Sequence, residues 1–335
     1  MKPVVVIAEA GVNHNGSLDM AKKLVAAAAA AGADVVKFQT FNTDLCISPE
    51  TKKADYQVEQ TGAKGTQYEM VKGLELGYED FCELQAECSR CGVVFNSSAF
   101  DLESVDFLHG LKVPFWKIPS GELTNLPFLR KVAKYGEPVV MSTGMATLSE
   151  VKAAYQVFRD NGVAERDITV LQCHTDYPTR FEDVNLLAMN LLRREFPNSD
   201  VGYSDHSVGI EVCIGAVALG AQVVEKHFTL DRTLPGPDHS ASLEPAELTS
   251  MISAIRNIEC ALGEETKKPT PSEAKIKLVA RKSIVAARHI SAGNVLTEQD
   301  LAVKRPGDGV NPMRWDEFVG KIAHRDYEEG DQIEP

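Results

Sequence analysis

The chain has 335 residues, of which 44% are hydrophobic and 25% are charged, as in an ordinary soluble globular protein. Its formal net charge of −13 argues against a nucleic-acid partner, because binding a phosphate backbone needs a basic face. No apolar run approaches the ~20 residues that cross a bilayer, so we expect no membrane partner. Residues 4–7 resemble a first strand and no signal-peptide cleavage region precedes them, which predicts a cytoplasmic protein.

The cysteines do not indicate a disulfide scaffold. There are seven of them, an odd number, and they are not densely spaced. Cys88 and Cys91 form a CxxC pair, but no second pair stands at zinc-ribbon spacing. We therefore expect reduced, structural thiols, with a metal or redox role as the alternative.

Residues 1–263 alternate short β-branched runs with helical stretches, the pattern of parallel α/β folds. The first helix is expected over residues 18–31, with Ser17 as its N-cap and Gly32 at its end. Eight strands are expected, at residues 4–8, 34–38, 92–96, 115–118, 138–142, 168–172, 200–203 and 222–226. Eight strand–helix units of this total length predict a TIM (β/α)8 barrel as the catalytic domain. The alternative is an open doubly wound sheet, but residues 9–13 lack its glycine-rich phosphate turn.

The pattern changes after the barrel. Residues 264–280 are polar, contain Pro269 and Pro271, and are expected to form a linker. Residues 281–335 have short β-like runs separated by turn residues, which predicts a small, mostly β domain. A domain of this size is only marginally stable alone, so we expect it to pack against something, a neighbouring subunit being one candidate.

Polar clusters end almost every expected strand, where a TIM barrel carries its chemistry. In chain order they are Glu9, Asn13 and His14; Lys37 and Gln39; Asn96, Ser97 and Ser98; Lys117, Ser120 and Glu122; Ser142 and Thr143; residues 173–177; Ser204, Asp205 and His206; and Glu225, Lys226 and His227. Solubility alone does not explain this placement.

Two of these side chains predict an anion site. Lys37 and Lys117 lie at the ends of expected strands, and two ammonium groups at one mouth repel each other unless an anion lies between them. Hydroxyl donors are expected beside them from Ser120, Ser142 and Ser204. The alternative is that each lysine only pairs with a nearby acid such as Glu9 or Glu122.

Two histidines and two acids have catalytic potential. His206 and His227 end adjacent strands, where two neutral imidazoles suit a divalent ion such as Mn²⁺ or Zn²⁺, with water and substrate completing its shell. The alternative is a pair of structural, hydrogen-bonded histidines. Glu9 and Glu122 follow apolar strands, so burial and nearby lysines can tune either for proton transfer. The alternative for each is a structural partner of a lysine.

Several motifs resemble the bacterial sialic acid synthase family. In order along the chain they are IAEAGVNHNG (residues 7–16), VKFQT (36–40), KIPSGE (117–122), STGM (142–145), GYSDH (202–206), EKHFT (225–229) and GPD (236–238). In addition, VKRPG (303–307) resembles the signature motif of the family's C-terminal antifreeze-like (SAF) domain. The resemblance implies a TIM barrel, a linker and an SAF domain that is swapped across a homodimer. It also implies condensation of phosphoenolpyruvate with the aldehyde of an N-acylated mannosamine-type sugar, addition of water and release of phosphate.

The resemblance also implies roles for single residues. His206 and His227 match metal ligands, usually for Mn²⁺, and Glu9 and Glu122 match two acids, one of which positions or deprotonates water. The residues that match the phosphoenolpyruvate site are Lys37, Lys117, Ser120, Ser142 and Ser204. The residues that match sugar contacts are Gln39, Tyr177, Asp238 and, from the SAF domain of the other subunit, Arg305.

The chain departs from the family pattern in two places. Residues 97–100 lack the usual proline after strand three but keep a hydroxyl at Ser98, which we assign to the phosphoenolpyruvate site. After strand six, His174 stands where we expect threonine, and Thr175 stands where neuraminate synthases often have asparagine. The asparagine contact to phosphoenolpyruvate is therefore not assigned here.

The acceptor sugar is predicted from residues 46–57 and 238–245, which look more like the legionaminate-type branch than the neuraminate type. We therefore favour 2,4-diacetamido-2,4,6-trideoxymannose as the acceptor, with N-acetylmannosamine as the alternative. Two other functions remain: a metal-dependent aldolase that uses pyruvate, and a sugar- or ice-binding protein. The lysines with serines argue against the first, and the polar barrel mouth argues against the second.

Overall fold

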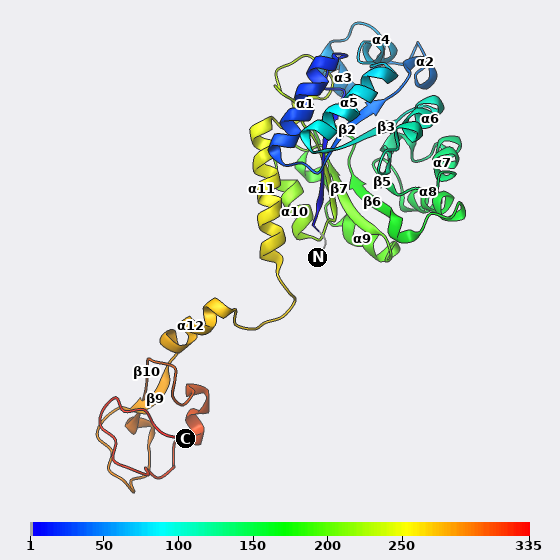
Figure 1. Ribbon diagram of the computed structural model, residues 1–335. Helices are drawn as coiled ribbons and strands as arrows, with labels where there is room; N and C mark the ends of the chain where they lie inside the picture. Colours follow the sequence, from blue (N-terminus) through cyan, green and yellow to red (C-terminus); the bar gives the residue numbers. More distant parts are fainter. Residues whose placement is uncertain (1–2) are drawn as a thin grey trace. The chain divides into compact units, whose positions relative to one another are not determined.

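The computed structural model describes residues 3–335, which form two compact units, residues 3–263 and residues 264–335. In the first unit eight parallel strands form a nearly closed barrel (Figure 1). The strands are β1 (Val5–Gly11), β2 (Val35–Thr40), β3 (Val94–Ala99), β4 (Trp116–Ile118), β5 (Val139–Ser142), β6 (Ile168–Cys173), β7 (Asp200–Asp205) and β8 (Val223–His227). β1 pairs with both β2 and β8, and the Asn96 side chain donates a 3.0 Å hydrogen bond to the Phe115 carbonyl beside the seam between β3 and β4. The predicted TIM barrel is therefore confirmed, and the doubly wound sheet is excluded.

Helices between the strands cover the outside of the barrel. They are α1 (Leu18–Ala31), α5 (Tyr78–Cys91), α6 (Leu102–Leu111), α7 (Leu126–Ala133), α8 (Leu148–Asp160), α9 (Ala188–Glu195), α10 (Glu211–Ala218) and α11 (Pro245–Leu262). Short 3₁₀ turns lie at η1 (Ser120–Glu122), η2 (Glu165–Asp167), η3 (Phe181–Asp183) and η4 (His239–Ala241). The predicted ends of α1 are confirmed: Ser17 accepts a hydrogen bond from the Met20 amide, and Gly32 takes the left-handed conformation at φ 85°.

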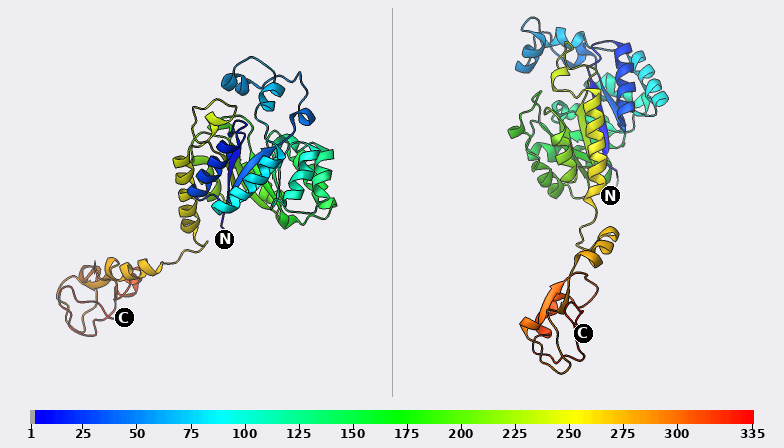
Figure 2. Two further views of the ribbon diagram at one scale, coloured as in Figure 1. Left: turned by 45° about the horizontal axis from the view of Figure 1, so that its top comes forward. Right: turned by 90° about the vertical axis from the view of Figure 1, so that its left-hand side faces the viewer.

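The connection from β2 to α5 is unusually long and holds three short helices. They are α2 (Thr43–Cys46), α3 (Asp55–Thr61) and α4 (Gln67–Lys72). In both views of Figure 2 these helices (light blue) gather at one end of the barrel. This is the end to which the strands run, so the connection lies where the site is expected.

The inside of the barrel is built in layers, because alternate residues of a strand point to the same face. Ile7, Val35, Val140, Leu171 and Val223 are buried together in an apolar layer, with Phe115 packed against it. Two positions further along each of these strands stand Glu9, Lys37, Ser142, Cys173, Glu225 and Lys117, all buried. The fold therefore places one polar layer directly above one apolar layer.

The second unit has its own small core. It contains α12 (Pro271–Ala280), the antiparallel strands β9 (Ser283–Ala286) and β10 (Leu301–Lys304), and the 3₁₀ turns η5 (Glu298–Asp300) and η6 (Pro312–Glu317). Its core includes Ile284, Leu301, Phe318 and Tyr327. Across residues 3–335 no helix is long and apolar enough to span a membrane.

Candidate active site

A cavity of about 600 Å³ opens at the carboxyl end of the barrel strands. Every site residue predicted in the first unit lines it: Glu9, Lys37, Gln39, Ser98, Lys117, Ser120, Glu122, Ser142, Tyr177, Ser204, His206, His227 and Asp238. These residues come from all eight strands and the turns after them. Their convergence confirms where the polar clusters lie, whereas their individual roles stay predictions.

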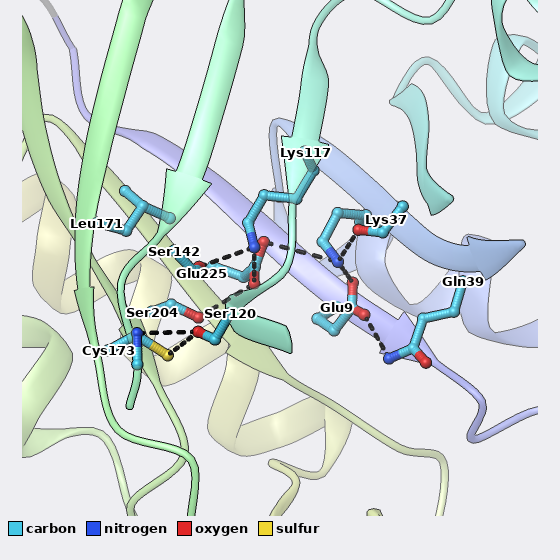
Figure 3. Close-up of polar contacts among 12 residues, drawn as sticks. Glu9, Lys37, Gln39, Lys117, Ser120, Ser142, Leu171, Cys173, Ser204 and Glu225 are labelled. Atoms are coloured by element: carbon cyan, nitrogen blue, oxygen red, sulfur yellow. Dashed lines mark hydrogen bonds and ion pairs between the residues drawn. The ribbon is translucent and has the colours of Figure 1, made fainter. Parts of the chain in front are cut away.

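Four buried charges occupy the floor of this cavity (Figure 3). Lys37 Nζ lies 2.6 Å from Glu9 Oε2 and 3.8 Å from Glu225 Oε2. Lys117 Nζ lies 3.3 Å from Glu225 Oε1. Two acids and two cations, all with nearly buried side chains, therefore lie next to one another at the bottom of the cavity.

Serine hydroxyls surround these charges. Lys37 Nζ donates to Ser98 Oγ at 3.1 Å, and Lys117 Nζ donates to Ser142 Oγ at 2.8 Å. Ser204 Oγ donates to Glu225 Oε1 at 3.1 Å. Each ammonium group thus has at least one acid and one hydroxyl as neighbours. The hydroxyls of Ser98 and Ser142 accept these bonds and remain able to donate to a bound anion.

Glu225 is a buried residue of the candidate site to which the sequence analysis gave no role. The alternative interpretation paired the lysines with acids such as Glu9 or Glu122; Lys37 does contact Glu9, but Lys117 pairs with Glu225. Glu225 stands two residues before His227 on the same strand, so both side chains face the barrel interior. The alternation of side chains along a strand was the signal that would have found it, because a His227 that faces the barrel interior also places Glu225 there, one layer below.

The two central acids have different protonation behaviour. Burial raises the pKa of Glu9 to about 7, although the nearby Lys37 opposes this shift and Glu225 adds to it. Burial also disfavours the charged form of Glu225, but Lys117 and Lys37 outweigh it and hold the pKa of Glu225 below its usual value. Glu225 is therefore the permanent anion, and Glu9 can exchange a proton near neutral pH.

Ser120 and Glu122 lie in the 3₁₀ turn after β4. Ser120 Oγ accepts a 3.0 Å hydrogen bond from the Gly144 amide, where a Cβ would lie only 2.8 Å from this oxygen. Glu122 Oε2 accepts a 2.6 Å hydrogen bond from Asn125 Nδ2, and burial raises the pKa of Glu122. Glu122 is thus a carboxyl group at the cavity wall, without a lysine partner among the described residues.

The two predicted metal ligands lie side by side. The ring centroids of His206 and His227 are 5.1 Å apart, and the Tyr177 ring lies 4.1 Å from His206. His206 Nδ1 donates to the backbone carbonyl of His174, so Nε2 keeps the lone pair that binds a metal. This contact gives His174 a structural role through its backbone.

These imidazoles fit a divalent ion that has only two protein ligands. Within residues 3–335 no group of three or more His, Cys, Asp or Glu side chains is arranged to hold a metal. His227 Nδ1 is buried without a hydrogen bond, and Asp238 Oδ2 lies 3.8 Å from it. Water and substrate would therefore have to complete the coordination shell.

The remaining predicted sugar contacts fall in two places. Gln39 Nε2 donates to Glu9 Oε1 at 3.2 Å, and Asp238 is buried beside His227, so both lie in the barrel cavity. Arg305 is exposed at the end of β10 in the second unit. Its predicted contact with the sugar stays a prediction.

Comparisons with known proteins identify the family. The NeuB family matches residues 24–267, and the SAF domain matches residues 281–335. The chain belongs to the NeuB family. An N,N'-diacetyllegionaminic acid synthase from Campylobacter jejuni is 49% identical to this NeuB-family chain over 333 residues, 99% of each protein. The resemblance predicted from the sequence is therefore confirmed.

Two further relatives of this NeuB-family chain are similar over most of its length. An N,N'-diacetyllegionaminic acid synthase from Legionella pneumophila is 45% identical over 318 residues, which cover 94% of this chain and 89% of that protein. Among solved structures, the N-acetylneuraminic acid synthetase of Leptospira borgpetersenii has a TM-score of 0.72 at 33% identity, over 82% of this chain and 90% of that one.

Proposed function

We propose that the protein condenses phosphoenolpyruvate with 2,4-diacetamido-2,4,6-trideoxymannose and water, and that it releases N,N'-diacetyllegionaminate and phosphate. Two relatives with 49% and 45% identity are N,N'-diacetyllegionaminic acid synthases, which supports this acceptor. The observation that carries the proposal is the pair of buried lysines, each bonded to a serine hydroxyl at the barrel mouth. An aldolase that uses pyruvate needs no such phosphate pocket.

Phosphoenolpyruvate would bind above the charged floor. Its carboxylate and phosphate would accept hydrogen bonds from Lys37, Lys117 and the hydroxyls of Ser98, Ser120, Ser142 and Ser204. Charge-assisted hydrogen bonds of this kind are shorter and stronger than neutral ones. Glu225 would remain between the two ammonium groups and keep them oriented toward the ligand.

The reaction forms one carbon–carbon bond and one carbon–oxygen bond, to the oxygen of water, and it breaks the carbon–oxygen bond to phosphate. The methylene carbon of phosphoenolpyruvate attacks the aldehyde carbon of the open-chain sugar, water adds to the resulting oxocarbenium carbon, and phosphate leaves. Glu9 has a pKa of about 7 and is therefore suited to take a proton from the water. Glu122, whose pKa burial also raises, is the second candidate for this role.

The aldehyde end of the sugar would lie beside the two histidines. A divalent ion, Mn²⁺ in our proposal, would be held by His206 and His227 and would polarise the aldehyde oxygen. Gln39, Tyr177 and Asp238 line the cavity around this point and would orient the sugar hydroxyls. Gln39 and Asp238 both present polar groups that fit a hydroxyl.

We further propose a homodimer in which the partner's Arg305 reaches the acyl group of the sugar. Arg305 is exposed in its unit, and Ile276, Leu278 and Val279 of α12 are exposed apolar residues that an interface would cover. We place the enzyme in the cytoplasm, since all seven cysteines are free. Light scattering of the intact protein tests the dimer, and a monomeric mass would contradict it.

The decisive experiment measures phosphate release from phosphoenolpyruvate with Mn²⁺ and each of two sugars. We expect much faster turnover of 2,4-diacetamido-2,4,6-trideoxymannose than of N-acetylmannosamine. The opposite preference would make the protein an N-acetylneuraminate synthase. No phosphate with either sugar in metal-loaded protein would overturn the proposed function.

A matched pair of variants tests the anion site. Lys117→Met removes one ammonium group and should lower kcat/KM for phosphoenolpyruvate by about 10²-fold or more. Lys23→Met makes the same change at an exposed position of α1 and should leave kcat/KM unchanged. Equal effects of the two variants would contradict the assignment of Lys117.

A further inference from the structure

The connection from β2 to α5 contributes one wall of the cavity, and this wall is uncharged. The residues that it supplies to the cavity are Phe41, Cys46, Ile47, Ala54, Tyr56, Gln57, Gln67, Met70, Val71 and Leu74. The same segment carries many charged residues, among them Lys52, Asp55, Glu59, Glu69 and Lys72, and none of these lines the cavity. A segment that turns every charge away from a polar site presents a surface for an uncharged ligand group.

Most of this wall is apolar. Leu74 is buried in one cluster with Val12 and Phe41, and Val71 packs against that cluster. Val71 itself is only partly buried and lines the cavity, so its methyl groups face both the cluster and the cavity space. A hydroxyl group that is placed here without a partner costs about 1–3 kcal/mol, whereas a methyl group gains from burial.

Two amides interrupt the apolar surface at one point. Gln67 Nε2 donates to Gln57 Oε1 at 3.1 Å, and the same oxygen accepts from the Ala54 amide at 3.0 Å. The Gln57 oxygen is thus saturated, and its side chain is nearly buried at 7% exposure. Gln67 Oε1 accepts no hydrogen bond from residues 3–335, so this fixed amide retains an acceptor for a ligand N–H.

A row of aromatic rings connects this wall to the reacting end of the cavity. The Tyr56 ring stacks on Tyr177 with centroids 5.3 Å apart, and Tyr177 contacts the His206 ring at 4.1 Å. Gln57 Nε2 donates to the Tyr56 hydroxyl at 3.3 Å. A sugar whose aldehyde lies beside His206 would therefore extend along these rings, and its far carbons would reach Gln67 and Val71.

We propose that Gln67 and Val71 form the subsite that selects the acceptor, by binding a second acetamido group and the terminal methyl group of a 6-deoxy sugar. This inference rests on the proposed function and adds the residues that set its specificity. An acetamido group has an N–H that Gln67 Oε1 accepts and a methyl group that packs on the apolar wall. A sugar with hydroxyls at these carbons leaves them without partners beside Val71, and such mismatches give discrimination of about 10–200-fold.

The test uses two variants and one control, and it measures binding as well as turnover. Gln67→Leu removes the free amide oxygen but keeps the side-chain volume. Val71→Thr is nearly isosteric and places a hydroxyl in the apolar wall. Gln60→Leu repeats the first change at an exposed residue of α3 that does not line the cavity. For each protein we would measure calorimetric binding of the reduced, open-chain diacetamido sugar and kcat/KM for both acceptors.

We expect Gln67→Leu to weaken binding of the reduced diacetamido sugar about tenfold, while KM for phosphoenolpyruvate stays unchanged. Val71→Thr should narrow the ratio of kcat/KM between the diacetamido sugar and N-acetylmannosamine by about tenfold. Gln60→Leu should behave as the wild type. Effects of Gln67→Leu and Val71→Thr no larger than those of Gln60→Leu, or equal losses for both acceptors, would overturn this inference.

The same data separate this inference from the proposed function. If the wild type condenses phosphoenolpyruvate with the diacetamido sugar and neither variant changes its preference between the two acceptors, the proposed function stands and only the inference about the subsite is overturned. If the wild type turns over neither sugar, the proposed function itself is overturned. In that case the calorimetric comparison of the wild type with Gln67→Leu still decides the subsite, because it does not depend on turnover.

Discussion

Glu225 contacts both buried ammonium groups, Lys117 at 3.3 Å and Lys37 at 3.8 Å, although its side chain is almost fully buried. Glu225→Gln preserves the shape but leaves Lys117 without a carboxylate among the described residues. We expect a loss of about 3 kcal/mol in the free energy of unfolding, because an unpaired buried charge is costly. Urea denaturation of the ligand-free protein measures this loss.

The same urea denaturation can be repeated in the presence of inorganic phosphate. Phosphate supplies the negative charge that Glu225→Gln removes, so it should stabilise the variant more than the wild type. Glu83→Gln is the matched control, since the Glu83–Lys22 pair is largely exposed to solvent and should contribute little to stability. A Glu225→Gln protein as stable as the wild type would show that the two lysines do not need this carboxylate.

His14 gives the fold a pH dependence of predictable sign. Burial lowers the pKa of His14 to about 4, and the nearby His239 adds to this shift. Below the usual pKa near 6.5 the unfolded chain binds a proton that the folded chain does not, so stability falls as the pH decreases from about 6.5 to about 4. Between pH 7 and pH 5, protonation of His14 in the unfolded chain should lower the free energy of unfolding by about 2 kcal/mol.

Asn in place of His14 isolates this contribution. His14 Nδ1 accepts a 3.1 Å hydrogen bond from the Gly16 amide, and an Asn oxygen can accept in its place without titrating. When the pH is lowered from 7 to 5, the free energy of unfolding measured by urea denaturation should therefore decrease by about 2 kcal/mol less for His14→Asn than for the wild type. Parallel pH profiles for the two proteins would assign the acid sensitivity to other groups.

At the scale of elements, the eight strands and α1 were predictable because local chemistry specifies them. β-branched runs mark the strands, and Ser17 and Gly32 mark the ends of α1. Several strands extend further than predicted, as β2 does to Thr40, because their polar residues remain paired in the ladder. The wall formed by α2, α3 and α4 was not predicted, since which side of a short helix faces a cavity depends on contacts distant in sequence.

Gly202 shows where an element tolerates no side chain. It lies in β7, and a Cβ there would approach the Val223 carbonyl oxygen to 2.2 Å and Leu171 to 2.7 Å. Gly202→Ala should therefore destabilise the protein by about 3 kcal/mol, because backbone atoms of β8 must move. Gly110 lies in α6 with no atom within 4 Å of its Cβ position, so Gly110→Ala should stabilise the protein by about 0.5–1 kcal/mol. Thermal unfolding of both variants measures the two opposite changes in stability. A Gly202→Ala protein as stable as the wild type would contradict the tight packing of β7.

At the scale of the whole molecule, the chain folds as two units with separate cores. The core of the first unit draws on residues up to Ile255, and that of the second begins at Ile284. Every residue from 261 to 282 is exposed, so burial does not protect this stretch from a protease. Which residues share a core was predictable from pattern, whereas the proposed contact of Arg305 with the sugar depends on assembly and stays a prediction.

Limited trypsin digestion should therefore cleave first within residues 264–282, where Lys267 is exposed in a segment without regular structure. The barrel fragment should keep a cooperative melting transition within a few degrees of the intact protein, since its core is complete. The same fragment should lose turnover of N-acylated sugars, because it lacks Arg305. Mass spectrometry, calorimetry and the phosphate assay measure these three outcomes separately. A fragment that melts normally and keeps full turnover would remove Arg305 from the site, whereas one that no longer melts cooperatively would show that the barrel needs the second unit to fold.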